Sequence, residues 1–124
     1  MKFILGTKVN MTEYFSPDGR VVPVTIISTG PVKVVTVKSK ETDGYNAVQV
    51  GYGEQKKERV NKAQIGQMKG DTFKVLKEFR LKTGDTFEGA VGDTIDSSIF
   101  EVGDSLQVSG ISKGKGFQGV VKRH

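Results

Sequence analysis

The residues best suited to chemistry lie near the C-terminal end of this 124-residue sequence. Gly114, Gly116 and Gly119 have the G-x-G-x-x-G spacing that holds a dinucleotide pyrophosphate when it follows a strand and opens a helix. A dinucleotide site also needs a second strand and an acidic residue about 20 positions further on. Residues 120–124 supply neither of these, and the sequence has no Gly-Lys-Ser/Thr loop. We therefore expect no nucleotide cofactor.

The same stretch is better suited to the phosphate backbone of RNA. Lys113 and Lys115 alternate with Gly114 and Gly116. Glycine lets the main chain come close to a phosphate, and lysine supplies the positive charge. Phe117 follows directly and can either stack on a base or pack in the core. Packing is favoured for this ring, which nevertheless stays among the candidate RNA contacts.

Further phosphate donors follow at Lys122, Arg123 and His124. An arginine can bridge two phosphate oxygens, whereas a lysine acts as a point charge. Residues 111–124 hold four basic and no acidic side chains, while residues 83–110 hold six acidic and no basic ones. Such a division gives one surface suited to a polyanion and another that is not. The alternative is chance clustering on a solvated surface.

A second basic cluster lies in the middle of the sequence, where Glu54 and Glu58 dilute its charge. This cluster can bind RNA or form an ordinary solvated loop, and the sequence favours neither. Its candidate contacts, with one more basic residue near the start of the chain, are Lys56, Lys57, Arg59, Lys62 and Lys8.

Other kinds of site find little support. The sequence has no cysteine and a single histidine, which argues against thiol catalysis, cysteine-ligated metals and a histidine-based triad. The acidic pairs Asp85/Glu88 and Asp93/Asp96 can suggest a metal site or an acid–base dyad. Gly-Asp recurs at 84–85, 92–93 and 103–104, however, and this setting is typical of turns. We expect no catalytic residue, no metal, no cofactor and no enzymatic activity.

The elements that position these residues are mostly strands. The turn at residues 16–19 (SPDG) predicts a hairpin between residues 11–15 and 21–28. The second of these strands reads as buried, with Pro23 placing it at an edge or a bulge. Further strands are expected at 32–38, 45–50, 73–81 and 105–111. A helix capped by Asn61 is expected over roughly 62–69, ended by Gly70, and a helical turn over 96–100.

Length and composition set the scale of the fold. The 124 residues suffice for one domain with a small core, since 35% of them are hydrophobic and 16 are glycine. There is no apolar run near the length of a membrane span. Short strands with tight turns and about one helix predict a β-barrel or sandwich. A small barrel that binds other proteins through the acidic 83–110 face is the alternative function.

The sequence also resembles the bacterial large-subunit ribosomal protein L-three family. The resemblance runs along the whole chain in the same order. It is carried by the GTKVNMT block at 6–12, VPVT at 22–25, DGYNAVQ at 43–49 and SKGKGFQGVVKR at 112–123. Of these, SKGKGF followed by VKR is the most specific to the family.

The resemblance implies a mainly β fold, a translation-protein-type β-barrel, complete or incomplete within these residues, with a small α+β insertion and a basic C-terminal extension. Residues 1–111 would form the barrel domain, with the insertion around 53–82, and residues 112–124 would begin the extension. It implies a structural constituent of the large ribosomal subunit that binds large-subunit ribosomal RNA, supports early assembly, contacts neighbouring ribosomal proteins and lies in the cytoplasm. The extension would run toward the peptidyl transferase centre.

Two departures from the family pattern bear on the fold. Asn10 stands where the family usually has glycine, and asparagine tolerates a left-handed turn better than most residues. The family also continues beyond this point with the rest of the extension and the strands that close the barrel. We expect this chain to be a fragment, a truncated product or a version completed by another chain. Apolar strand edges would then be exposed.

Overall fold

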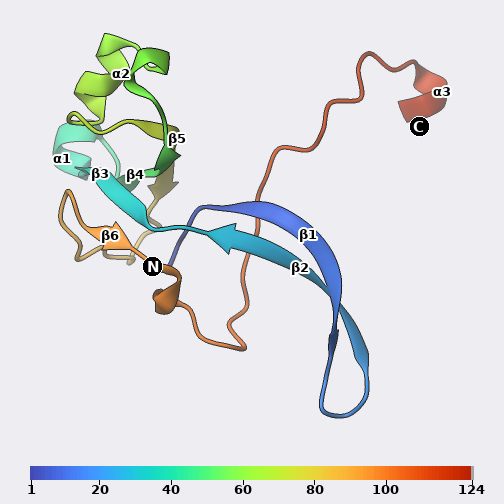
Figure 1. The fold of residues 1–124 in the computed structure, drawn as a ribbon. Coiled ribbons are helices and arrows are strands. Elements are labelled where there is room, and N and C mark those ends of the chain that lie inside the picture. Colours follow the sequence, from blue (N-terminus) through green and yellow to red (C-terminus); the bar gives the residue numbers. More distant parts are fainter. Residues whose placement is uncertain (124) are drawn as a thin grey trace.

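Two antiparallel sheets organise residues 1–123, the part of the chain that the computed structural model describes (Figure 1). The first sheet is the hairpin of β1 (Gly6–Phe15) and β2 (Val21–Thr29). The second has four strands in the order β5-β4-β3-β6. Its strands are β3 (Val32–Lys38), β4 (Ala47–Glu54), β5 (Phe73–Arg80) and β6 (Thr94–Ile95). The helical pieces are α1 (Lys40–Asp43), η1 (Lys57–Arg59), α2 (Lys62–Gln67), η2 (Ser97–Ile99) and α3 (Val120–Arg123).

The β1–β2 hairpin projects away from the four-stranded sheet (Figure 1). Its turn forms as predicted: Gly19 takes a φ of 74° and donates its N–H to the carbonyl of Ser16 at 2.9 Å. Asn10 does not turn the chain, because it pairs with Ile26 beside a register shift in β1 and its φ is negative. The left-handed turn considered for Asn10 is therefore wrong.

The core lies on one face of the four-stranded sheet. Side chains alternate between the faces of a strand, so Val32 and Val34 of β3 share a face with Val48 and Val50 of β4. All four are at most 1% exposed. Phe3 covers them and stacks on Phe79 with ring centroids 4.5 Å apart.

The local elements predicted around α2 and the Gly-Asp turns are confirmed. The Asn61 side chain accepts the N–H of Gln64 at 2.8 Å, which caps α2, and Gly70 leaves the helix with a φ of 94°. Gly84, Gly92 and Gly103 have φ values of 95°, 100° and 99°, as turn glycines do. The helical turn expected over 96–100 is η2.

Two expectations about strands are wrong. The strand over 21–28 is not buried: Val21 is 53% and Ile26 44% exposed, because β2 pairs only with β1 and no second layer covers it. Residues 105–111 form no strand, since residues 105–118 make no backbone hydrogen bond within the described chain.

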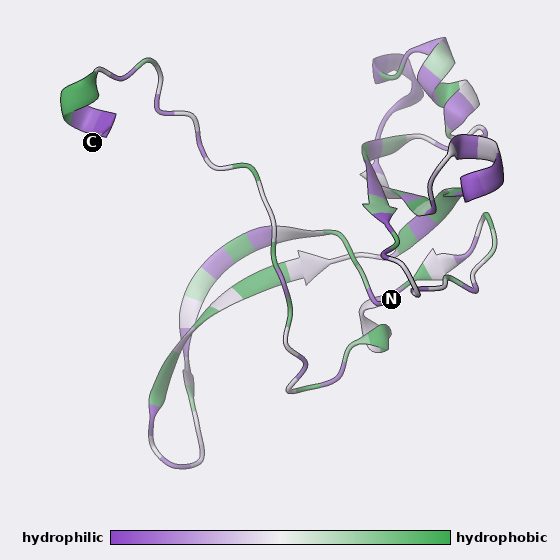
Figure 2. Cartoon of the chain, turned by 180° about the vertical axis from the view of Figure 1, so that it is seen from behind, coloured by the Kyte–Doolittle hydropathy of each residue, from purple (hydrophilic) through white to green (hydrophobic). Residues whose placement is uncertain are grey.

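The mainly β class is confirmed, but residues 1–123 do not close a barrel (Figure 2). The division into domains stays a prediction.

Among residues 1–123, no helix combines the length and the apolar character that a membrane crossing requires.

Gly51 offers a test of packing between β4 and β5. A Cβ atom at this buried position would overlap the ring of Phe73, whose Cδ2 and Cγ are the nearest atoms, so the whole ring and not a flexible chain end would have to move. We expect Gly51→Ala to lower the free energy of unfolding by about 2 kcal/mol in urea denaturation, as overpacking does. The matched control is Gly66→Ala in α2, where an added Cβ meets nothing within 4 Å. That variant is expected to gain up to about 1 kcal/mol from helix propensity, and an equal loss at both sites would contradict the packing argument.

Candidate nucleic-acid interface

The segment 112–123 lies beyond β6 and η2, away from the four-stranded sheet, as an extended chain that ends in α3 (Figure 1). Every residue in it except Gln118 is exposed, including Lys113 and Lys115. Gly116 has a φ of 67°, a conformation that glycine adopts without strain. The main-chain N–H and C=O groups of residues 112–118 have no partner among the described residues. They are therefore open to water or to a ligand.

Phe117 does not pack into the fold. Its side chain is 104% exposed, so the expectation that this ring joins the core is wrong. An exposed aromatic ring between lysines and glycines is suited to stacking on an unpaired base. Of the two uses considered for Phe117, the structure therefore leaves stacking on a base.

The end of the segment forms the single turn α3. The N–H groups of Lys122 and Arg123 donate to the carbonyl of Gly119 at 3.1 and 3.3 Å, and both side chains are exposed. His124, the last of the candidate contacts, lies outside the described residues. The candidates at the C-terminal end therefore follow one another along a single solvent-exposed segment.

The second basic cluster is assembled by η1 and α2. Lys57 and Arg59 belong to η1, Lys56 precedes it and Lys62 opens α2, and all four are exposed. Lys8 lies apart from them in β1. Figures 1 and 2 both place α2 and α3 in separate parts of the molecule. The structure therefore brings together the members of each basic cluster, but not the two clusters.

Among residues 1–123, none of the candidate cations forms an ion pair with an acidic side chain. The ion pairs within residues 1–123 use other lysines, at Lys2, Lys33 and Lys38, whose partners are Asp104, Asp71 and Glu78. Glu54 and Glu58, which dilute the middle cluster in sequence, form none of these pairs. A basic side chain without an acidic partner keeps its full charge for an anionic ligand.

A cluster that the sequence did not predict lies on the other face of the four-stranded sheet. Lys38 of β3 donates to Glu78 of β5 at 2.8 Å and to the hydroxyl of Tyr45 at 3.0 Å. Arg80 lies over the Tyr45 ring, 4.5 Å from its centroid. These residues meet because Ala47 pairs with both Lys38 and Arg80 across the sheet. Alternation counted from Val34 would place Lys38 on the core face, and the register shift between Val34 and Thr36 brings it to this face instead. Nothing in the sequence predicted that shift or the pairing.

The ion pair between Lys38 and Glu78 shifts the pKa of both side chains. Hydrogen bonds from Lys38 and then Tyr45 hold the pKa of Glu78 below its ordinary value of 4.5. Hydrogen bonds to Glu78 and Tyr45 raise the pKa of Lys38. A carboxyl whose pKa is lowered on folding contributes stability above its ordinary pKa, and this contribution is lost as the pH falls through its lowered value.

The Glu78→Gln variant tests that dependence. We expect it to unfold at lower urea concentration than the wild type at neutral pH, with the gap shrinking as the pH falls below about 4.5, where Glu78 of the wild type takes up its proton. Urea unfolding at a series of pH values measures the gap. Glu88→Gln is the matched control, because Glu88 is exposed and forms none of the ion pairs within residues 1–123. A gap that persists unchanged into acid would contradict the assignment.

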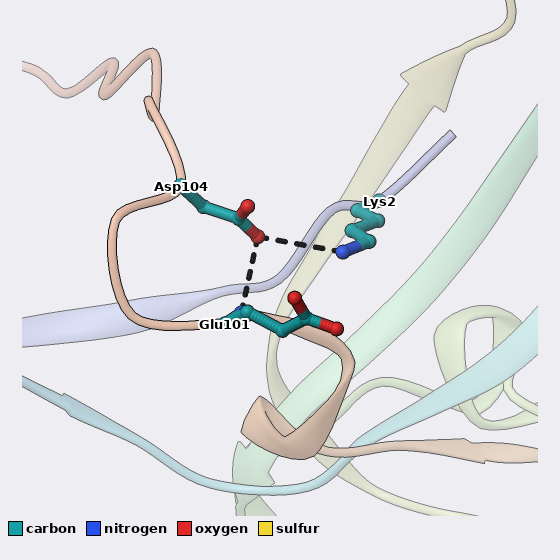
Figure 3. Close-up of polar contacts among 3 residues, drawn as sticks. All are labelled: Lys2, Glu101 and Asp104. Atoms are coloured by element: carbon teal, nitrogen blue, oxygen red, sulfur yellow. Dashed lines mark hydrogen bonds and ion pairs between the residues drawn. The ribbon is translucent and has the colours of Figure 1, made fainter.

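The chain just before the extended segment contacts the N-terminal residues through Asp104 (Figure 3). Asp104 accepts the main-chain N–H of Glu101 at 3.1 Å and faces the ammonium group of Lys2 at 3.4 Å. These contacts, the first from Glu101 and the second from Lys2, lower the pKa of Asp104. Asp93 likewise accepts the N–H of Ala90 at 2.7 Å. Both aspartates thus accept a main-chain N–H within a turn. Residues 1–123 contain no group of three or more acidic or histidine side chains that could hold a metal ion.

The amino-acid sequence is similar to those of known ribosomal proteins. No protein-family model matches the chain. Three curated relatives, each named large ribosomal subunit protein uL3, match it along 99–100% of its length. The one from Finegoldia magna is 49% identical, that from Carboxydothermus hydrogenoformans 48% and that from Desulforapulum autotrophicum 46%. The chain spans about 60% of the length of these relatives. Over its whole length, the chain is thus 46–49% identical to part of these large ribosomal subunit proteins named uL3.

Proposed function

We propose that the chain is a structural, non-catalytic part of the large subunit of the cytoplasmic ribosome, where it binds large-subunit ribosomal RNA and supports early assembly. The observation that carries the proposal is the exposed segment 112–123, whose cations have no acidic partner among the described residues. The names of the relatives support the same assignment. Neighbouring large-subunit proteins are its further partners.

The mechanism is neutralisation of phosphates rather than reading of base edges. Lys113, Lys115, Lys122 and Arg123 supply charge along an extended main chain, and the glycines between the lysines allow close approach to the RNA backbone. Phe117 adds a stacking surface that accepts any base. Lys8 and the Lys56–Lys62 cluster extend the contact beyond the segment.

Binding to large-subunit ribosomal RNA is expected to weaken steeply with salt. Each phosphate contact contributes a slope of about −0.7 to −0.9 in the plot of log affinity against log salt concentration. Filter binding of the 124-residue chain to the RNA across a salt series measures this slope. An affinity that does not change with salt would contradict phosphate neutralisation, and the absence of any binding would contradict the proposed function itself.

A further inference from the structure

The Tyr45 ring on the polar face of the four-stranded sheet lies between two cations. The guanidinium of Arg80 is 4.5 Å from the ring centroid and the ammonium of Lys38 is 5.2 Å from it. Ala47, fully buried, separates Lys38 from Arg80 in the cross-strand row. Because alanine is small, the row has space for the tyrosine ring between the two longer side chains.

The two cations differ in what else they bind. Lys38 is bonded to Glu78 and to the Tyr45 hydroxyl, so its charge is already paired. Arg80 has no carboxylate within ion-pair distance and its side chain makes no hydrogen bond among residues 1–123. The protein thus holds the guanidinium over the Tyr45 ring, while its N–H donors have no side-chain or carboxylate partner among residues 1–123.

An arginine in this state is suited to one kind of ligand. A guanidinium that stacks on an aromatic ring keeps its edge free, and the fork of N–H donors on that edge matches two oxygens of a phosphate. The ring limits the orientations of the side chain, which reduces the entropy that binding would cost. Lys82, exposed two residues further along the chain, adds positive charge beside Arg80.

We propose that Arg80, held against Tyr45, binds a phosphate of the ribosomal RNA backbone at a contact separate from the segment 112–124. The inference rests on the proposed function, since it takes the same RNA as ligand. It adds a second point of attachment at the end of β5, and Figures 1 and 2 both show β5 and α3 in separate parts of the molecule. Two separated contacts would fix the orientation of the sheet on the RNA.

Variants of Arg80 and Tyr45 test the proposal by filter binding to large-subunit ribosomal RNA. Arg80→Ala is expected to weaken binding about tenfold and to reduce the salt slope by about one contact. Arg80→Lys keeps the charge without the fork, so we expect an unchanged slope and a partial loss of affinity. Tyr45→Leu keeps every charge but removes the ring, and is expected to weaken binding, whereas Tyr45→Phe retains the ring and is expected to bind nearly as well as the wild type.

The matched control is Arg20→Ala, which removes the same charge from an exposed arginine next to the hairpin turn. Far-UV circular dichroism establishes that each variant keeps its strands. If Arg80→Ala and Arg20→Ala weaken binding equally while Lys113→Ala still weakens it strongly, the Arg80 contact is wrong and the proposed function stands. If the wild type does not bind the RNA, both are wrong.

Discussion

Replacing Lys113 and Lys115 together by alanine is expected to weaken binding to large-subunit ribosomal RNA roughly 30-fold at physiological salt. Both lysines are exposed on the segment 112–123, and neither has an acidic partner among the described residues. Each would release counterions from one phosphate, and the loss of two such contacts corresponds to this factor at about 0.15 M salt. Filter binding at several salt concentrations measures both the affinity and the loss of about two contacts from the slope.

The matched control removes the same charge elsewhere. Arg20 and Lys74 are exposed, lie outside the segment and form none of the ion pairs of residues 1–123. Replacing both by alanine is expected to weaken binding less than about threefold, through the long-range field alone. Replacing the acidic Asp93 and Asp96 by alanine is expected to have a smaller effect than the loss of the two lysines. If the Arg20/Lys74 variant weakens binding as much, net charge rather than the segment accounts for the affinity.

Folding does not confound this comparison. The two lysines lie between Asp104, the last residue before the segment with a backbone hydrogen bond, and Gly119, where α3 is anchored. No strand, ion pair or core contact in residues 1–123 depends on them. A change in RNA affinity for the lysine variant can therefore be assigned to the lost contacts rather than to a damaged sheet.

The parts of the fold that could be predicted from the sequence are those set by neighbouring residues. The Ser16–Gly19 turn, the Asn61 cap and the Gly-Asp turns all depend on the φ preference or the side-chain acceptor of a residue at the turn itself. The exposure of the basic segment was also predictable, because glycines and lysines supply little that could be buried.

The parts that could not be predicted depend on partners far away in the sequence. Residues 105–111 alternate as a strand does, yet a strand also needs a free edge to pair with, and no such edge is aligned with them in residues 1–123. The contact of Arg80 with Tyr45 depends on the register of β4 against β5. Phe3 is buried over the core because it packs against Phe79 and Phe87, which lie more than seventy positions away in the chain.

Replacing Phe3 by alanine is expected to lower the free energy of unfolding by about 3–5 kcal/mol, the usual cost of removing a buried phenylalanine. Phe3 is 6% exposed, stacks on Phe79 at 4.5 Å and contacts Phe87 with ring centroids 5.8 Å apart. It covers the buried valines of β3 and β4, and it is the one aromatic ring among the buried residues of that core cluster within residues 1–123. Urea denaturation followed by far-UV circular dichroism measures the change, since the chain has no tryptophan.

Phe15→Ala is the control for this experiment, because it makes the same substitution at a ring that is 66% exposed at the end of β1. It is expected to cost less than about 1 kcal/mol, as the ring gives up little buried area. If the Phe3 variant were no less stable than the Phe15 variant, Phe3 would not be the cover of the core. If the Phe15 variant lost as much stability as the Phe3 variant, the hairpin would be packed against another surface in solution, and its exposed valines and isoleucines would be the side chains that such a surface covers.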